Sequence, residues 1–207
     1  MEEKNSENSE LSQYEGVGLF IWEIVKIFVL AFIIIAPIRM FLFQPFFVQG
    51  ASMEPNFENN EYLIINELGY KETPVGIKDN NLFTVGDFKE FKRQDIAVFK
   101  YPKDPSKFFI KRVIGLPSEK IEIKNGKIKI YNTENPEGFL LDESAYLDKK
   151  VFTQGDVVLQ LKDNEYFMMG DNRPYSSDSR SWGPVPKEDI IGNVIFRAWP
   201  LNRINIF

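Results

Sequence analysis

The fold class of this chain is decided by the stretch Lys120-Ile121-Glu122-Ile123-Lys124-Asn125-Gly126-Lys127-Ile128-Lys129-Ile130-Tyr131. Isoleucine alternates with charged residues on both sides of Asn125-Gly126, which is the pattern of two strands that each bury one face. Asn-Gly also supplies the positive φ that a type I′ turn requires. The stretch therefore predicts a β-hairpin and makes antiparallel β-structure the expectation for the segments around it.

Short runs of the same kind lie on both sides of the hairpin. We expect strands at residues 61–66, 95–100, 107–114, 157–161, 165–169 and 190–199. We expect loops at 69–93 and 132–156. Because no long helical periodicity follows the N-terminal region, the predicted fold class is mainly β, an antiparallel sheet or barrel-like domain preceded by a single helix.

The chain contains no His and no Cys. A Ser-His-Asp triad, a Cys nucleophile, a His/Cys zinc site and a disulfide are therefore all excluded. The 25 basic and 30 acidic side chains give a net charge of −5, and no basic cluster dominates, so nucleic acid is not an expected partner. If a hydroxyl is the nucleophile here, its base has to be another residue, and lysine is the known alternative.

A long apolar stretch occupies residues 17–43, and Glu23, Lys26 and Arg39 interrupt it. Its uninterrupted part, residues 27–38, is shorter than the ~20 residues that cross a bilayer as a helix. Extension towards the N-terminus reaches that length, because Glu23 and Lys26 share a helix face, can pair and can reach the interface. We therefore predict a single transmembrane anchor over 17–43, with an interfacial amphipathic helix and a buried core helix as the alternatives.

The regions around the anchor complete the predicted organisation. Residues 1–16 are polar and acidic and have little to bury, so we expect a disordered tail. A cleaved export signal fits the anchor less well, because the stretch is long, the preceding region is acidic and no small-residue cleavage pattern follows. Residues 44–207 form the predicted β-domain, with a smaller inserted subdomain around 118–164. Charge alone leaves the orientation of the anchor undetermined.

Ser52 lies directly behind the apolar stretch, in Gln49-Gly50-Ala51-Ser52-Met53-Glu54-Pro55. As a structural residue it would be a turn serine or a helix N-cap. A capping box would place Glu or Gln three residues later, where this chain has Pro55. Gly50 allows close approach of the backbone, and Pro55 favours an extended or turn conformation before it. Ser52 is therefore a candidate nucleophile, with a structural serine as the alternative.

Lys111 lies in Phe108-Phe109-Ile110-Lys111-Arg112-Val113-Ile114, the most apolar setting of any lysine outside the anchor. On a strand, Phe109, Lys111 and Val113 point to one face, so the amine would lie between two apolar side chains. A lysine base near neutral pH needs its pKa lowered by about 3 units from ~10.4, and burial has that effect because it disfavours the ammonium form. The alternative is a solvated strand lysine.

A third cluster of polar residues follows the strand expected at 165–169, and it reads Gly170-Asp171-Asn172-Arg173-Pro174-Tyr175-Ser176-Ser177-Asp178-Ser179-Arg180. As a surface loop it would be held by Asp178–Arg180 or Asp171–Arg173 ion pairs, which contribute little where they are exposed. As part of a site it would provide a hydroxyl that orients the lysine amine, as the third member of a triad orients its base.

Together these features closely resemble bacterial type I signal peptidase, the membrane-bound leader peptidase that removes signal peptides from exported proteins. The resemblance runs from about Trp22 to Phe207 and keeps the order of the motifs. It is carried by the anchor, Ser52-Met53-x-Pro55, Lys111-Arg112-Val113-Ile114-Gly115-Leu116-Pro117 and the Gly170–Arg180 cluster. Gly50 departs from it, because some members have a hydroxyl residue there. An oxyanion hole would then depend mainly on backbone N–H groups, that of Ser52 included.

The resemblance implies a Ser-Lys dyad serine protease with the signal peptidase type of β-domain. Ser52 would be the acylating nucleophile, Lys111 the general base, and Ser176 the hydroxyl that bonds the Lys111 amine. Asp178 and Arg180 would form a structural ion pair near the site. The substrate would be cut after small residues, typically with alanine at the first and third positions before the cut. Shallow apolar pockets for these side chains would be shaped by Phe46, Val48, Met53 and Phe109.

The same resemblance implies the surroundings of the enzyme. Its substrates would be signal-peptide-bearing preproteins, and its other partner would be the lipid bilayer. The chain would cross the plasma membrane once, with residues 1–16 in the cytoplasm and the catalytic domain on the extracytoplasmic face. No metal or organic cofactor would be required.

Other functions fit the sequence less well. A catalytically inactive, membrane-tethered β-domain that acts as a binding module is the alternative, and intact Ser52, Lys111 and Ser176 argue against it. A self-cleaving Ser-Lys repressor would need a DNA-binding domain where this chain has a membrane segment. A penicillin-binding enzyme or β-lactamase would need a Ser-x-x-Lys tetrad, which the sequence lacks.

Overall fold

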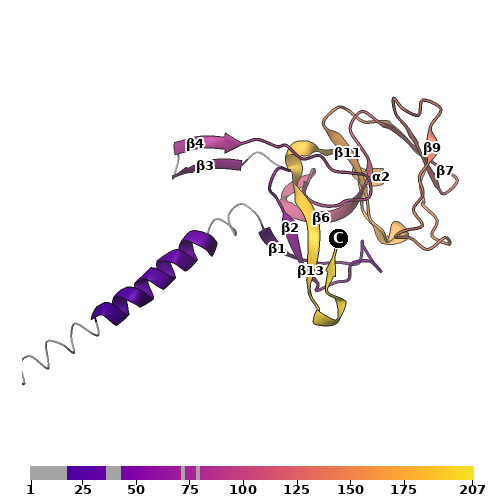
Figure 1. Ribbon diagram of the computed structural model, residues 1–207. Coiled ribbons are helices and arrows are strands. Elements are labelled where there is room, and N and C mark those ends of the chain that lie inside the picture. Colours follow the sequence, from indigo (N-terminus) through magenta and orange to yellow (C-terminus); the bar gives the residue numbers. More distant parts are fainter. Residues whose placement is uncertain (1–17, 36–42, 71–72, 78–79) are drawn as a thin grey trace, which may run out of the picture. The chain divides into compact units, whose positions relative to one another are not determined.

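The computed structural model describes residues 18–35, 43–70, 73–77 and 80–207 (Figure 1). These residues belong to two compact units, 1–41 and 42–207, and each unit is treated by itself. The tail predicted at 1–16 lies outside the described residues.

The first unit contains a helix, Gly18–Ile35, that is long and apolar enough to cross a membrane. At 1.5 Å per residue it spans about 27 Å, close to the ~30 Å hydrocarbon core of a bilayer. Glu23 and Lys26 pair on one face of it, with 2.5 Å between Oε1 and Nζ, as the sequence predicted. The helix lies within the predicted anchor. The last residue of that anchor, Phe43, belongs instead to the first strand of the second unit.

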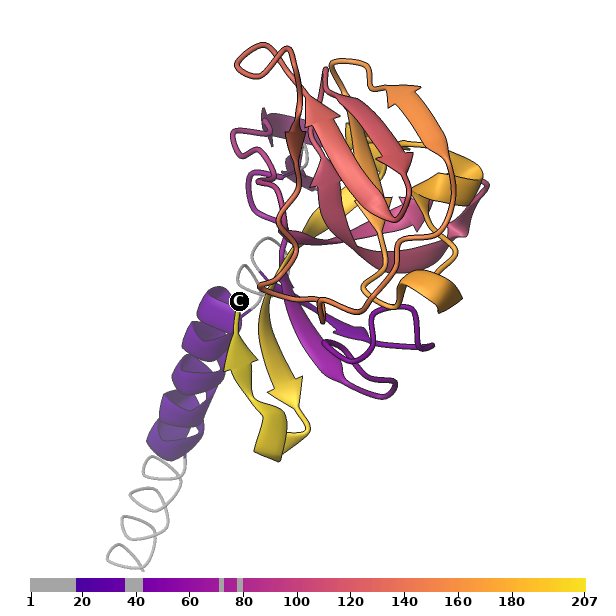
Figure 2. The ribbon, with the colours of Figure 1, turned by 90° about the vertical axis from the view of Figure 1, so that its right-hand side faces the viewer.

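The second unit is built on an eight-stranded sheet whose described neighbours are antiparallel (Figure 1). From one edge to the other its strands are β1 (Phe43–Phe47), β2 (Tyr62–Asn66), β13 (Ile190–Trp199), β5 (Ile96–Tyr101), β6 (Asp104–Gly115), β11 (Glu165–Met169) and β12 (Val185–Pro186). Figure 2 shows β14 (Asn205–Ile206) folded back beside β13 at the C-terminus. The strands predicted for this sheet are all present, with ends that differ by a few residues.

Strand β5 lies in the middle of this sheet, and its residues Ile96 to Phe99 are all buried. Ile96 and Val98 pack into one apolar cluster, whereas Ala97 and Phe99 pack into a second. Alternate side chains of a strand point to opposite faces, so both faces of the sheet are covered at β5. This double coverage explains why the strand is an uninterrupted apolar run rather than an alternation.

A smaller four-stranded sheet carries the predicted hairpin. Its strands, in order, are β10 (Val157–Gln160), β7 (Lys120–Lys124), β8 (Lys127–Tyr131) and β9 (Phe139–Leu140). Asn125 and Gly126 have φ values of 51° and 77°, as a type I′ turn requires. The isoleucines of the hairpin are buried in one cluster with Ile114 and Phe167 of the main sheet. The smaller sheet lies within the insertion expected at 118–164, and this shared core holds it against the main sheet.

The segment 69–93, expected as a loop, contains two paired strands. β3 (Thr73–Ile77) and β4 (Asn80–Val85) form a separate two-stranded sheet. The prediction was wrong because the β-branched residues of β3, which favour a strand, outweigh the turn-forming Gly, Pro and Asn residues around them. The loop expected at 132–156 is irregular in the structure apart from β9 and one isolated bridge.

Short helical turns connect the later strands. They are η1 (Arg173–Tyr175), α2 (Ser179–Trp182), η2 (Lys187–Asp189) and η3 (Leu201–Arg203). Asp178 caps α2, because its side chain accepts from the Arg180 backbone N–H. The polar cluster at 170–180 is therefore a structured loop that contains η1 and the first residues of α2.

Candidate active site

Ser52 lies in a turn between β1 and β2. Met53 and Phe57, which follow it, are buried in the core, and the Phe57 N–H donates to the Met53 carbonyl at 2.9 Å. Gly50 precedes it with a φ of 94°, a conformation that favours glycine. The Gly50 N–H donates to Asn59 Oδ1 at 2.9 Å. These contacts fix the turn and leave Ser52 partly exposed.

Lys111 comes from β6 and reaches Ser52. Its Nζ lies 2.7 Å from Ser52 Oγ and donates to the Ile110 carbonyl at 2.8 Å. The residue is only 3% exposed, and the centre of the Phe109 ring lies 5.3 Å from Nζ. The two side chains are close enough for direct proton transfer, although 59 residues separate them along the chain. The sequence prediction that they come together is confirmed.

Burial dominates the electrostatics of the Lys111 amine. It lowers the pKa of Lys111 from its ordinary value of 10.5 to about 8, because the ammonium form loses its hydration in this site. The carboxylates of Asp178 and Asp171 act in the opposite direction and limit the shift. A lysine with this pKa is partly neutral near physiological pH, so it can accept a proton there.

The ion pair expected between Asp178 and Arg180 is present, and it holds the loop that follows β11. Arg180 Nε lies 2.8 Å from Asp178 Oδ1, and the Asp178 side chain is fully buried. Asp178 Oδ2 also accepts from the Gly170 N–H at 3.1 Å, and Arg180 Nη2 donates to the Arg173 carbonyl at 2.7 Å. These bonds tie the two ends of the loop to each other.

Ser176 lies beside the Ser52 turn, but it does not bond the lysine. A Cβ atom on Gly170 would come 2.2 Å from Ser176 Oγ and 2.4 Å from the Ser52 carbonyl oxygen, so the three residues are in close contact. Among the described residues, the buried Ser176 Oγ has no hydrogen-bond partner. The expected Ser176–Lys111 hydrogen bond is therefore not formed in this structure, where the amine contacts Ser52 Oγ and donates to the Ile110 carbonyl.

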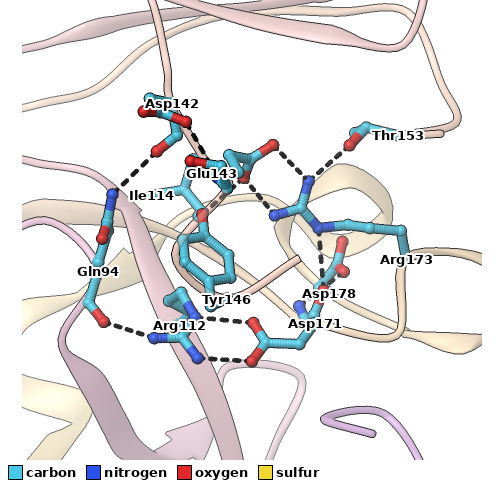
Figure 3. Close-up of polar contacts among 12 residues, drawn as sticks. Gln94, Arg112, Ile114, Asp142, Glu143, Tyr146, Thr153, Asp171, Arg173 and Asp178 are labelled. Atoms are coloured by element: carbon cyan, nitrogen blue, oxygen red, sulfur yellow. Dashed lines mark hydrogen bonds and ion pairs between the residues drawn. The ribbon is translucent and has the colours of Figure 1, made fainter. Parts of the chain in front are cut away.

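Arg112, the residue after Lys111, connects β6 to the same loop (Figure 3). Its guanidinium binds the Asp171 carboxylate at both ends, with Nε–Oδ1 and Nη2–Oδ2 distances of 2.8 and 2.6 Å. The Tyr146 ring covers the guanidinium, and its centre lies 4.0 Å from Arg112 Cζ. Because alternate residues of a strand face opposite sides, Lys111 lines the groove, whereas Arg112 binds Asp171 of the loop.

Arg173 belongs to a second buried ion pair in Figure 3. It pairs with Glu143, and its Nη1 donates to Thr153 Oγ1 at 2.5 Å. The sequence had suggested an Asp171–Arg173 pair, and that interpretation was wrong, because Asp171 binds Arg112. Proximity along the chain suggested the wrong partners, since the turn at 171–173 directs the two side chains to different elements.

Two asparagines that the sequence did not single out tie the Ser52 turn to the loop. Asn172 donates its backbone N–H to the Ser52 carbonyl at 3.0 Å and its Nδ2 to the Ala51 carbonyl at 2.9 Å. Asn56 Nδ2 donates to Asp171 Oδ2 at 2.8 Å. Sequence reasoning gave them no role of their own, because the partners of a side-chain amide, here the Ala51 carbonyl and the Asp171 carboxylate, lie far away along the chain.

A groove with a volume of about 730 Å³ opens beside Ser52 and Lys111. Three of the four expected pocket residues, Phe46, Val48 and Phe109, line it. Met53 does not, because it is buried in the core beneath the turn. Residues that line the groove and were not predicted as pocket residues include Lys107, Phe108, Ile110, Tyr175 and Ser177.

This arrangement can carry out acyl transfer. Ser52 supplies a hydroxyl, Lys111 an amine that takes up a proton near pH 8, and the groove a place for an extended peptide. In the described part of the chain, no group of three His, Cys, Asp or Glu side chains could hold a metal ion.

Comparison with known proteins decides the family. A profile of the family described as "Signal peptidase, peptidase S26" matches residues 21–199. The chain belongs to this family. Signal peptidase I P of Bacillus subtilis subsp. natto is 34% identical over 183 residues, which cover 87% of this chain and 90% of that protein. Probable signal peptidase I-2 of Synechocystis sp. is 30% identical over 190 residues, which cover 89% of this chain and 76% of that protein.

A solved structure is also similar to this member of the signal peptidase family. Signal peptidase I of Enterococcus faecalis V583 is 29% identical, with a TM-score of 0.42, over 51% of this chain and 97% of that chain. The protein is a serine endopeptidase of the type I signal peptidase family, as the sequence predicted. The mainly β fold behind one apolar N-terminal helix is confirmed, and that helix together with the relatives indicates membrane anchoring.

Proposed function

We propose that this signal peptidase removes N-terminal signal peptides from exported proteins through an acyl-enzyme on Ser52, with Lys111 as the general base. The observation that carries the proposal is the 2.7 Å contact between Ser52 Oγ and an Nζ that is buried and has a lowered pKa. The intact pair also favours an enzyme over the inactive binding module.

The chemistry takes two steps. Neutral Lys111 removes the proton from Ser52 Oγ, which attacks the carbonyl carbon of the scissile peptide. The tetrahedral intermediate collapses when the Lys111 ammonium gives its proton to the leaving amine, and the signal peptide remains as an ester on Ser52. Lys111 then deprotonates a water molecule, which attacks the ester carbon. The Lys111 ammonium returns this proton to Ser52 Oγ as the ester bond breaks, and the signal peptide is released with a free carboxyl group.

Two free strand edges support the binding of an extended substrate. β1 is the outer strand of the main sheet and pairs with β2 alone among the described strands. β11 pairs with β6 only between Arg112 and Gly115, so residues 104–111 have no described strand on that side. Both edges border the groove. In our proposal the substrate enters it as an added strand.

The walls of the groove explain the expected preference for small side chains. Side chains of a bound strand alternate, so the first and third positions before the cut face the same way. Phe46 and Phe108 meet edge to face, with ring centres 5.7 Å apart. In our proposal these rings, with Val48 and Phe109 of the same groove, form shallow apolar pockets that accept alanine at both positions.

The remaining roles follow from the same scheme. Asp178 and Arg180 keep the loop in place, and the unpartnered Ser176 hydroxyl takes over as hydrogen-bond partner of the Lys111 amine once Ser52 is acylated. We place the catalytic domain on the extracytoplasmic face of the plasma membrane, with a single pass and a cytoplasmic tail. Because enzyme and preprotein are both held at the same membrane, the bilayer confines them to one interface, which raises their effective concentration.

The test uses the purified full-length protein in detergent with an exported precursor. We expect a shortened product whose new N-terminus, read by sequencing, follows an Ala-x-Ala type of site. Ser52→Ala and Lys111→Met should each abolish cleavage and leave the fold intact, whereas Lys124→Met, the same change on an exposed lysine of β7, should not. Turnover retained by either active-site variant would exclude the dyad.

A further inference from the structure

Asn172 contacts the peptide groups on both sides of the Ser52 Cα atom. Its Nδ2 donates to the Ala51 carbonyl at 2.9 Å, and its backbone N–H donates to the Ser52 carbonyl at 3.0 Å. One residue from the loop after β11 therefore holds two consecutive carbonyls of the nucleophile turn. These two bonds and the Gly170 contact are what join this loop directly to Ala51 and Ser52 within the described residues.

The planarity of the peptide group turns these bonds into a constraint on Ser52. A trans peptide is flat, so its C=O and N–H point in opposite directions. A bond that fixes the Ala51 carbonyl therefore fixes the direction of the Ser52 N–H, and a bond that fixes the Ser52 carbonyl sets the next plane. With both planes held, the φ and ψ of Ser52 are restricted, and with them the direction of its N–H and of its Cα–Cβ bond.

The Ser52 N–H is the group that this constraint leaves available. It donates to no acceptor among the described residues. A free donor directed at the place where an oxyanion develops is the usual device for stabilising a tetrahedral intermediate. Glycine at position 50 offers no side-chain hydroxyl that could share this work.

Asn172 is itself held in position by hydrogen bonds to its own backbone and to the neighbouring Asp171. The Tyr175 N–H donates to its carbonyl at 3.0 Å, and the preceding residue, Asp171, is bound at both carboxylate oxygens by Arg112. Arg112 is the neighbour of Lys111 on β6. The same rigid strand therefore positions the base and, through Asp171 and Asn172, the nucleophile turn.

We propose that Asn172 is a positioning residue that aims the Ser52 N–H at the oxygen of the scissile carbonyl. This role rests on the proposed acyl-enzyme function of Ser52. Replacement by Ala or Asp removes only the side-chain bond, because both residues keep the backbone N–H that donates to the Ser52 carbonyl. The Ala51 carbonyl also accepts from the Glu54 N–H at 3.2 Å, so loss of the amide loosens the plane without leaving that carbonyl unpaired.

The test compares Asn172→Ala and Asn172→Asp with Gln160→Glu in the full-length protein in detergent. Asp has the shape of Asn, but its carboxylate cannot donate to the Ala51 carbonyl. Gln160 is the matched control, because its amide donates to the carbonyls of Ser118 and Leu161 at 2.9 and 3.2 Å in the smaller sheet. For each variant we would measure kcat, KM, the unfolding temperature and inhibition by a peptide aldehyde that ends in alanine.

The aldehyde reports on the proposed donor. Ser52 Oγ bonds its carbonyl carbon and gives up its proton to Lys111, and the former carbonyl oxygen then lies where the oxyanion of the substrate would form. We expect both Asn172 variants to lower kcat roughly 10- to 100-fold and to weaken aldehyde inhibition by the same factor. KM should change less than two-fold, the unfolding temperature should stay within a few degrees, and Gln160→Glu should behave as the wild type.

Two results would overturn this role for Asn172. In the first, kcat and aldehyde inhibition of both variants stay within two-fold of the wild type. In the second, the losses in kcat and KM follow a loss of unfolding temperature, as they would for a merely structural residue. Failure of the proposed function gives a different result, because Ser52→Ala would then keep its activity whatever the Asn172 variants do.

Discussion

Lys111 keeps its proton in the folded protein only at a cost in stability. In the unfolded chain it holds the proton up to its ordinary pKa of 10.5, whereas burial lowers the pKa in the native state to about 8. Between these two values the unfolded state binds more protons, so stability rises with pH. Below pH 8 the whole penalty is present, because both states carry the charge.

Replacement of Lys111 by methionine should therefore stabilise the protein while it removes activity. We expect Lys111→Met to raise the free energy of unfolding at pH 7 by at most on the order of 3 kcal/mol, the equivalent of the pKa shift. The advantage should shrink as pH rises from 8 towards 10.5. Denaturant titrations at pH 7 and pH 10, with Lys124→Met as the control, measure both effects. A variant that is less stable than the wild type at pH 7 would contradict the burial penalty.

Gly170 is a second residue at which a small change should affect activity, because there is no room for a Cβ atom. A Cβ there would lie 2.4 Å from the Ser52 carbonyl oxygen, which forces the nucleophile turn to move. We expect Gly170→Ala to lower kcat/KM at least about ten-fold and to cost about 1–3 kcal/mol of stability from overpacking. Gly86→Ala is the control, because nothing lies within 4 Å of the atom it adds. Near-normal kinetics of Gly170→Ala would show that the turn tolerates displacement.

At the level of strands and loops, polar contacts join the smaller sheet and the irregular segment after β9 to the rest of the β-domain, including the loop after β11. Glu143, in the irregular segment after β9, pairs with Arg173, whose side chain is fully buried. Glu119, the residue before β7, pairs with Arg93, which precedes β5, and 2.7 Å separates Oε1 from Nη2. Through Glu143, the insertion therefore supports the loop that carries Asn172 and Ser176.

The contribution of the Arg173–Glu143 pair to the free energy of unfolding can be measured by mutation. Glu143→Gln leaves a buried guanidinium without its counter-charge, and we expect a loss of about 3 kcal/mol in the free energy of unfolding. Glu165→Gln, which breaks the pair with the exposed Lys162, should change it by less than about 1 kcal/mol. Denaturant unfolding of the three proteins side by side decides the question. Equal small losses would mean that the insertion is not held by this pair.

Local patterns allowed most of the strands to be predicted from the sequence, and tertiary contacts account for what was missed. The hairpin at Asn125-Gly126 was predicted from its alternation of apolar and charged residues. β5 was predicted from its uninterrupted apolar run, which is typical of a strand buried on both faces. β3 and β4 were missed because their turn-rich composition hid the β-branched residues. The partner of Asp171 was predicted wrongly because sequence neighbours are not spatial neighbours. Ser52 and Lys111 were each singled out by residue type and setting, because the chain has no His or Cys, and the family motifs supported their pairing.

The whole protein joins an apolar helix to a β-domain in a chain without cysteine. The helix is close to the length of a single span, and together with the signal peptidase relatives it indicates membrane anchoring. The proposed topology places the groove on the extracytoplasmic side. The absence of cysteine makes that side easy to measure, because any thiol that is introduced is the only one present.

We expect a cysteine in the tail and a cysteine in the β-domain to label from opposite sides. In spheroplasts, a membrane-impermeant maleimide should react with Lys149→Cys, at an exposed position of the β-domain. It should react with Ser9→Cys only after lysis. Labelling of Ser9→Cys in the intact membrane, with Lys149→Cys protected, would reverse the proposed topology.

The central claim is that a buried, readily deprotonated Lys111 activates Ser52, and the titration of that one amine tests it most directly. NMR of lysine labelled with ¹³C at Cε, assigned by the signal missing from Lys111→Met, gives its pKa in the native protein. We predict a midpoint at about 8, matched by a kcat/KM that rises with pH through the same midpoint. A midpoint near the ordinary 10.5, or activity that is flat from pH 6 to 9, would contradict it.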